Sequence, residues 1–202
     1  MASLKGVIPK ITFNAPVVLS FVLVCVVVQA VSTLTGGVST QLFFTAWPGS
    51  LVNPLTWLGL VSHIFGHIGW DHLIGNMSYI LLLGPLLEEK YGSLKLMGIM
   101  LASALACSLS NILLLHAGVV GASGIVFTFI LLSSVTSMRE GEIPLTFILV
   151  ASLYIGQQVY GAIFIHDGVS YLGHIAGGVM GAIVGFIMPT KEPASTSGYG
   201  ML

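Results

Sequence analysis

Charged side chains are scarce in this sequence. Only 6% of its 202 residues are Asp, Glu, Lys or Arg, whereas soluble domains carry about 25%. The mean hydropathy of +1.01 agrees with this shortage, so an ordinary soluble domain is excluded. The formal net charge is −1 and the chain has no run of basic residues, which leaves little to hold a nucleic-acid backbone. We therefore expect no nucleic-acid partner.

Cysteine is also rare. The two cysteines, Cys25 and Cys107, both lie in apolar stretches, so we expect no disulfide framework and treat both as small core hydrophobes. Also missing is the alternation of apolar and polar residues that the strands of membrane barrels show. Because a chain that crosses a bilayer must satisfy its own backbone hydrogen bonds, helices are the default. The predicted fold class is therefore an all-α membrane protein.

What the sequence has instead is long apolar segments. About twenty apolar residues in succession suffice to cross a bilayer as a helix. Six such segments, separated by charged or Gly- and Pro-rich breaks, cover residues 15–35, 71–87, 94–115, 120–138, 144–164 and 169–188. The first is too long for the core of a signal peptide and lacks a convincing cleavage site, so we count it as a span. The pattern predicts an integral, multi-pass membrane protein.

The segments outside the spans complete the predicted domain organisation. Residues 1–14 would be an N-terminal extension, residues 15–188 one six-helix domain, and residues 189–202 a polar tail that we expect to be disordered. Residues 36–70 form a first loop that is too long for a plain connector and too apolar for disorder. Asp71, which follows this loop, is predicted to be the N-cap of the second span.

The positive charges indicate how the spans are oriented. With six spans, every Lys and Arg falls on one side of the bilayer: Lys5, Lys10, Lys90, Lys95, Arg139 and Lys191. Because cytoplasmic loops are enriched in these residues, both termini are predicted to be cytoplasmic. We expect the protein in the plasma membrane, with all six histidines in the outer half of the molecule.

Four polar residues then fall at a similar depth. Counted at about 1.5 Å per helical residue, Ser123, His174, His72 and Asn76 stand about 21–27 Å above the cation that ends their own span. Intramembrane polar residues are functional suspects by default. A serine hydroxyl needs a base to become a nucleophile, and neutral imidazole is the usual one. We therefore expect Ser123 and His174 to touch.

Small residues surround this pair. Ser123 lies in the segment GASG between Gly121 and Gly124, where a backbone or substrate can approach closely. Beyond His174, Gly177 and Gly181 continue a stripe of small residues at intervals of four. Such a stripe lets helices pack tightly, and we expect the sixth span to pack against the fourth. In addition, Phe127 lies one turn after Ser123 and is predicted to stack on the imidazole.

An acyl-transfer site also needs donors for the developing oxyanion. His72 and Asn76 lie four residues apart on one helical face and can offer side-chain N–H groups, and the backbone N–H of Ser123 can add another. Asp167 is expected to lie too far out in its loop to orient His174. A Ser–His dyad is therefore the simplest hypothesis.

Together these motifs resemble the rhomboid family of intramembrane serine proteases. The matching patterns are His67-x4-His72-x3-Asn76, Gly121-Ala122-Ser123-Gly124 and His174-x2-Gly177-x3-Gly181, supported by Gly84-x3-Glu88-x3-Gly92. The resemblance implies a six-transmembrane-helix rhomboid bundle with a long, partly helical first loop. It implies Ser123 as nucleophile, His174 as general base and an oxyanion hole from His72, Asn76 and the Ser123 backbone. His63 and His67 would brace the first loop.

The resemblance also implies what the protein acts on. Expected substrates are single-pass transmembrane proteins, cleaved near the outer end of their span, with membrane lipid as the surroundings and no cofactor or metal. Two positions depart from the family pattern. Trp57 is followed by Leu58 where a Trp-Arg pair is common, and Phe127 stands where a tyrosine is frequent.

Two other interpretations remain open from the residues alone. His63, His67 and His72 could bind a metal, although the Glu of the zinc-protease motif His-Glu-x-x-His is absent, since Ile64 follows His63. Polar residues at membrane depth could also line a transport path, but transporters usually bury carboxylates or cations within their spans. The alternative function is thus a polytopic metal-binding or transport protein.

Overall fold

The computed structural model describes residues 11–135, 142–165 and 169–188. Apolar runs without internal breaks form long helices here, and Gly- or Pro-containing segments separate them. The elements are α1 (Pro16–Leu34), α2 (Val38–Phe43), α3 (Pro54–Ser62), α4 (Gly69–Tyr91), α5 (Ser93–Ser110), the π-helical turn η1 (Asn111–Leu115), α6 (Ser123–Val135), α7 (Leu145–Phe164) and α8 (Tyr171–Ile187).

Three of these helices are long and apolar enough to cross a membrane. They are α1, α5 continued by η1, and α7. The apolar helices α6 and α8 are shorter, with 13 and 17 residues. The 23-residue helix α4 has charged residues near both ends. The described residues thus form an all-helical protein with apolar helices, and the count of six spans stays a prediction.

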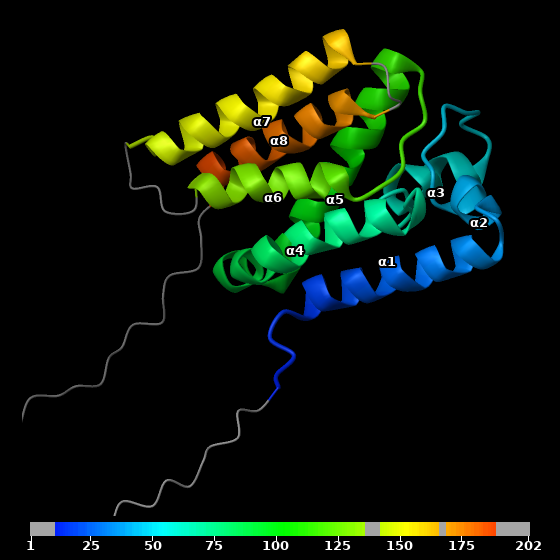
Figure 1. The fold of residues 1–202 in the computed structure, drawn as a ribbon, viewed down its shortest axis with the longest axis horizontal. Coiled ribbons are helices and arrows are strands. Elements are labelled where there is room, and N and C mark those ends of the chain that lie inside the picture. The colour runs from blue at the N-terminus through cyan, green and yellow to red at the C-terminus, as the bar shows by residue number, and fades with distance from the viewer. Residues whose placement is uncertain (1–10, 136–141, 166–168, 189–202) are drawn as a thin grey trace, which may run out of the picture.

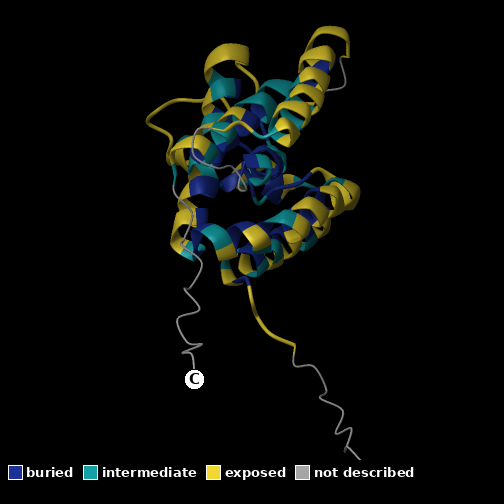
Figure 2. Ribbon diagram, turned by 90° about the vertical axis from the view of Figure 1, so that its left-hand side faces the viewer, coloured by how far each residue is buried: buried dark blue, intermediate teal, exposed yellow. Residues whose placement is uncertain are grey.

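Five helices lie side by side across the molecule. Figure 1 shows them in the order α7, α8, α6, α4 and α1, and each contacts the next, while α5 packs against α8 and α6. The central helix α6 is mostly apolar, and nine of its 13 residues are buried. A helix with so many apolar residues is stable only when neighbours cover it. Buried residues gather in the middle of the bundle, whereas exposed residues occur on most helices, as the burial colours show (Figure 2).

Helices α6 and α8 approach backbone to backbone. A side chain at Gly177 would overlap the carbonyl group of Gly124, and a side chain at Gly181 would overlap that of Thr128. The Thr128 hydroxyl adds a bond across the contact by donating to the carbonyl oxygen of Gly177 at 2.8 Å. The close packing expected from the small-residue stripe is therefore present.

Two helices do not begin where the sequence pattern predicts: α4 begins earlier and α6 begins later. Asp71 is not the N-cap of α4: the helix begins at Gly69, whose φ is +83°, and Asp71 lies in its first turn. There the carboxylate still favours the positive end of the helix dipole. The fourth predicted span begins at Ser123 instead of residue 120, because Gly121 has a φ of +119° that no α-helix allows. Its predicted end, Met138, lies outside the described residues.

The chain between α1 and α4 holds two short helices and reaches the start of α6. Asn53 caps α3 by accepting from the Leu55 N–H at 3.0 Å. Ala46 and Val119 exchange two backbone hydrogen bonds of 2.9 and 3.0 Å. The carbonyl oxygen of His63 accepts from the Gly121 N–H at 2.9 Å. These bonds hold the segment just before Ser123 in place.

Glu88 joins the end of α4 to the start of α1. Its carboxylate accepts from the backbone N–H groups of Val17 and Val18 at 3.0 Å each, and from the Ser93 hydroxyl at 2.7 Å. The first N–H groups of a helix have no partner within the helix. A carboxylate supplied by another helix therefore caps α1, and Glu88 is only 4% exposed.

Candidate active site

A serine and a histidine from neighbouring helices meet near the N-terminal ends of α6 and α8. Ser123 is the first residue of α6, and His174 lies one turn into α8. The Nε2 atom of His174 lies 2.8 Å from the Ser123 hydroxyl oxygen. The glycine contact between α6 and α8 begins directly below, at Gly124 and Gly177. Both side chains are only partly buried, so reactants can reach them.

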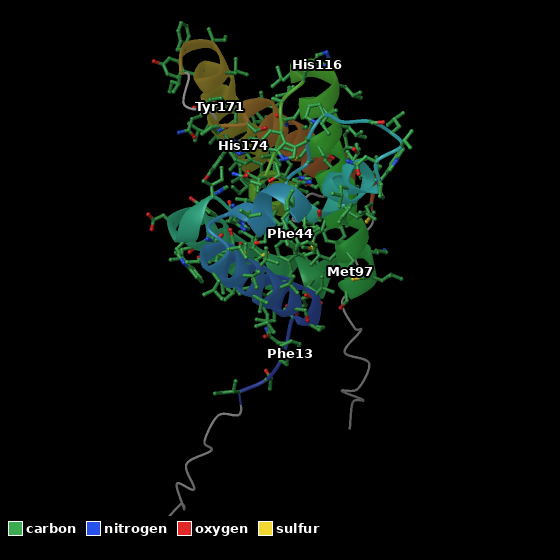
Figure 3. The ribbon with its side chains drawn as sticks, turned by 90° about the vertical axis from the view of Figure 1, so that its right-hand side faces the viewer. Phe13, Phe44, Met97, His116, Tyr171 and His174 are labelled. Atoms are coloured by element: carbon green, nitrogen blue, oxygen red, sulfur yellow. The ribbon has the colours of Figure 1, made fainter. Side chains whose placement is uncertain are left out.

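Aromatic rings hold the imidazole on two sides. Phe127 stacks on it, with ring centroids 4.6 Å apart and planes only 11° from parallel. Tyr171 meets it edge-on at a centroid distance of 6.5 Å, and the two residues lie close together in Figure 3. The stacking expected from the position of Phe127 is present. A ring fixed in this way can rotate little about its side-chain bonds.

The second ring nitrogen of His174 has a partner from α7. Its Nδ1 atom lies 2.7 Å from the side-chain oxygen of Gln158. Because an amide oxygen only accepts, Nδ1 carries the hydrogen and Nε2 presents a lone pair to the Ser123 hydroxyl. This is the protonation pattern that a general base requires.

Two side chains of α4 that can donate hydrogen bonds, His72 and Asn76, line the same cavity as Ser123. The Nδ1 atom of His72 accepts from the Ile68 N–H at 3.3 Å, so its Nε2 atom carries the hydrogen. The amide nitrogen of Asn76 is buried and has no hydrogen-bond partner among the described residues. A Cβ atom at Gly121 would lie 3.0 Å from His72 Nε2 and 3.8 Å from Asn76 Nδ2. Both donors therefore approach the backbone two residues before Ser123.

An open cavity of about 860 Å³ contains the whole group. Ser123, His174, His72 and Asn76 all line it, and the remaining lining is mostly apolar. A cavity of this size with a few convergent polar groups is typical of a substrate site. The structure thus brings together all four residues that the sequence analysis selected for chemistry.

The two first-loop histidines lie behind this group and not in the cavity. His63 and His67 are each 1% exposed, and their Nδ1 atoms donate to the carbonyl oxygens of Gly59 and Phe65. Burial lowers the pKa of each from 6.5 to about 4, so both rings are neutral at pH 7. The ring of His67 packs edge-on against His72 at a centroid distance of 5.1 Å. Their geometry suits a bracing role.

The arrangement offers little to a metal ion. Within the part of the chain that the structure describes, no three His, Cys, Asp or Glu side chains are grouped closely enough to hold one. Of the three histidines considered for a metal, His63 and His67 are buried and hydrogen-bonded to backbone. Asp167 lies outside the described residues.

Two further polar side chains, which the sequence motifs do not include, hold the histidine in place. Gln158 of α7 bonds directly to His174. Asn111 lies in the π-turn η1 and accepts from the hydroxyl of Ser170 at 2.7 Å. Ser170 in turn caps α8 by accepting from the Gly173 N–H at 3.2 Å. These bonds fix the turn that carries His174, and no spacing motif marks them in the sequence.

Comparisons with known proteins agree on one family. Residues 54–191 match the family model of the Rhomboid domain. The chain is 24% identical over 189 residues to the rhomboid protease GlpG of Yersinia pestis (strain Pestoides F), covering 90% of this chain and 65% of that protein. It is 24% identical over 155 residues to the chloroplastic rhomboid-like protein 11 of Arabidopsis thaliana, covering 69% and 55%. The chain thus spans less than two thirds of the length of either relative.

Proposed function

We propose, because this chain belongs to the rhomboid family, that it is an intramembrane serine endopeptidase. The observation that carries the proposal is the hydrogen bond of 2.8 Å between Ser123 and His174 inside an open cavity. A serine hydroxyl aimed at the bare nitrogen of an imidazole is the core of serine-protease chemistry. The names of the relatives agree with the proposal, since one of them is called a rhomboid protease.

The proposed reaction begins with attack of the Ser123 oxygen on the carbonyl carbon of a peptide bond. The hydroxyl proton passes to Nε2 of His174, and a tetrahedral intermediate forms with negative charge on the carbonyl oxygen. His174 then gives the proton to the leaving amine, which breaks the C–N bond and leaves an acyl group on Ser123. Water, deprotonated by the same imidazole, then attacks the ester carbon. The imidazolium returns this proton to the Ser123 oxygen as the acyl C–O bond breaks, which releases the second product as a carboxylic acid and regenerates the serine.

Three N–H groups support the negative charge in this scheme. They are Nε2–H of His72, Nδ2–H of Asn76 and the backbone N–H of Ser123, which lacks an intrahelical acceptor because it begins α6. Donors that are already aimed at the oxyanion cost no reorganisation during the reaction. The unpartnered amide of Asn76 supports this role, since it is free to bind a new acceptor.

The proposed substrates are single-pass transmembrane proteins, cut near the outer end of their span. The apolar lining of the cavity suits a peptide segment that enters from lipid. The proposal includes six spans in the plasma membrane and cytoplasmic N- and C-termini, as the distribution of Lys and Arg indicates. A polytopic metal-binding or transport protein is the alternative.

A cleavage assay with the full chain in detergent micelles tests the proposal. The substrate is a reporter with a transmembrane segment of low helix propensity, and Ser123→Ala should abolish cleavage while leaving the fold intact. Ser134→Ala, on the same helix but remote from the cavity, is the matched control and should cleave normally. A fluorophosphonate probe should label Ser123, as mapped by mass spectrometry.

A metal-binding or transport protein would not cleave the reporter at all. If ortho-phenanthroline stops cleavage while the fluorophosphonate leaves it unchanged, the serine assignment is wrong. Cleavage that persists in Ser123→Ala would also reject it.

A further inference from the structure

We propose that Gln158 of α7 is a positioning residue for the base His174, and that it completes a Ser–His–Gln triad. This inference rests on the proposed protease function. The main observation behind it is the 2.7 Å hydrogen bond between the Gln158 side-chain oxygen and Nδ1 of His174. In this arrangement the two ring nitrogens have partners on opposite sides, a hydroxyl from α6 and an amide oxygen from α7.

The burial of Gln158 sets it apart from the rest of its helix. Within α7, all of which the structure describes, the buried residues are Gln158 and Gly161. Gln158 is 6% exposed, whereas its neighbour Gln157 lies on the exposed surface. Burying an amide costs free energy unless it is hydrogen-bonded. The bond to His174 provides a specific reason for this glutamine to face inward.

Gly161 brings α7 close enough for the bond. A side chain at Gly161 would overlap the ring of Tyr171, and Tyr171 is the residue that meets His174 edge-on. Gly161 lies one turn after Gln158, so the absence of its side chain sets the spacing of α7 and α8 at the level of the base. The side chain of Gln158 then reaches Nδ1 directly.

The bond selects the form of imidazole that can act as a base. Neutral histidine has its hydrogen on either nitrogen, and only the form with a bare Nε2 can take the proton of Ser123. An acceptor at Nδ1 favours that form and also stabilises the imidazolium after proton transfer. An amide does this without a buried charge, which is costly at membrane depth.

The test compares three variants of the full chain by cleavage and by nitrogen-15 NMR of histidine. Gln158→Met removes the acceptor at similar size, and Gln158→Glu retains an acceptor oxygen. Gln157→Met is the matched control on the exposed side. We expect Gln158→Met to lower kcat/KM about 10-fold, as for one lost hydrogen bond. Gln158→Glu should restore most of the rate, and Gln157→Met should match the wild type.

The NMR readout separates orientation from general damage. In the wild type the His174 signal, assigned by its loss in His174→Ala, should show the hydrogen on Nδ1. In Gln158→Met the hydrogen should move partly or wholly to Nε2. A wild-type ring protonated on Nε2 overturns the inference, and this result needs no variant to fold. An unchanged rate or tautomer in Gln158→Met, or a Gln158→Glu enzyme as slow as Gln158→Met, overturns it too.

Failure of this inference is distinct from failure of the proposed function. If Ser123→Ala is inactive while Gln158→Met behaves as wild type, only the role of Gln158 falls. If Ser123→Ala still cleaves the reporter, the protease proposal itself falls.

Discussion

The amide nitrogen of Asn76 is the clearest sign of function at the scale of single residues. It is buried without a hydrogen-bond partner in the described part of the chain. Leaving a buried polar group unpaired costs about 1–3 kcal/mol. This cost is explained if the amide donates a hydrogen bond to the carbonyl oxygen of a substrate when one is bound.

Changing Asn76 to Ala should therefore affect rate and stability in opposite ways. We expect kcat to fall by about 10²–10³, the usual loss for one oxyanion donor. The melting temperature should stay the same or rise, because the variant removes an unsatisfied group. The measurement is a kinetic assay paired with thermal unfolding in detergent. A loss of rate below threefold would assign Asn76 to packing instead.

The sequence predicts some members of the site and not others for a physical reason. Four members can be predicted because their side chains are typical of catalytic sites and helical spacing alone puts them at one depth. They are Ser123, His174, His72 and Asn76. Gln158 is different, because its bond to His174 depends on how closely α7 and α8 approach at Gly161. Nothing in the spacing of residues along the chain reports that distance.

At the scale of elements, α1 depends on a carboxylate from α4. Glu88 accepts three hydrogen bonds, two of them from the first turn of α1. Hydrogen bonds to charged groups contribute about 1.5–3 kcal/mol each. In the sequence, Glu88 is recognisable only as part of a family motif, because its donors at Val17 and Val18 are backbone groups, which no pattern of side chains predicts.

Glu88→Ala should weaken the attachment of α1. We expect a loss of about 4–9 kcal/mol in the free energy of unfolding, since three hydrogen bonds of about 1.5–3 kcal/mol each are lost. Thermal unfolding in micelles measures this loss. Glu89→Ala is the matched control, because Glu89 is exposed at the next position. An equal effect of the two substitutions would show that the cap contributes nothing.

The helix boundaries show a second limit of the sequence. Apolar length predicts α1, α5 with η1, and α7 closely, but α6 begins three residues later than the apolar run does. The cause is the backbone of Gly121, whose positive φ cannot be inferred from an apolar run. That displacement matters, since it puts Ser123 at the helix terminus with a free N–H.

At the scale of the whole molecule, two buried histidines link the first loop to the site. The carbonyl group of His63 holds Gly121, and the ring of His67 supports His72. Burial lowers the pKa of both rings from 6.5 to about 4. Below pH 6.5 the unfolded chain therefore binds more protons than the folded one, and the folded state loses stability as the pH falls from 6.5 toward 4.

This linkage predicts a pH-dependent melting temperature. It should be constant near pH 7.5 and fall progressively below pH 6.5, as followed by thermal unfolding across a buffer series. His63→Gln removes one of the two groups and should flatten the slope. His116→Gln, at an exposed position, should leave the slope unchanged. A slope that is identical in wild type and His63→Gln would contradict the link between this ring and acid sensitivity.

The meeting of α6 and α8 at Gly124, Gly177 and Gly181 has one further consequence. Because main chain packs on main chain there, the distance between the two helix backbones is fixed, and only the rotamers of Ser123 and His174 remain to set the distance from hydroxyl to imidazole. A thicker or thinner bilayer would then tilt the two helices together as one rigid unit. We therefore expect the distance between Ser123 and His174 to stay the same in bilayers of different thickness.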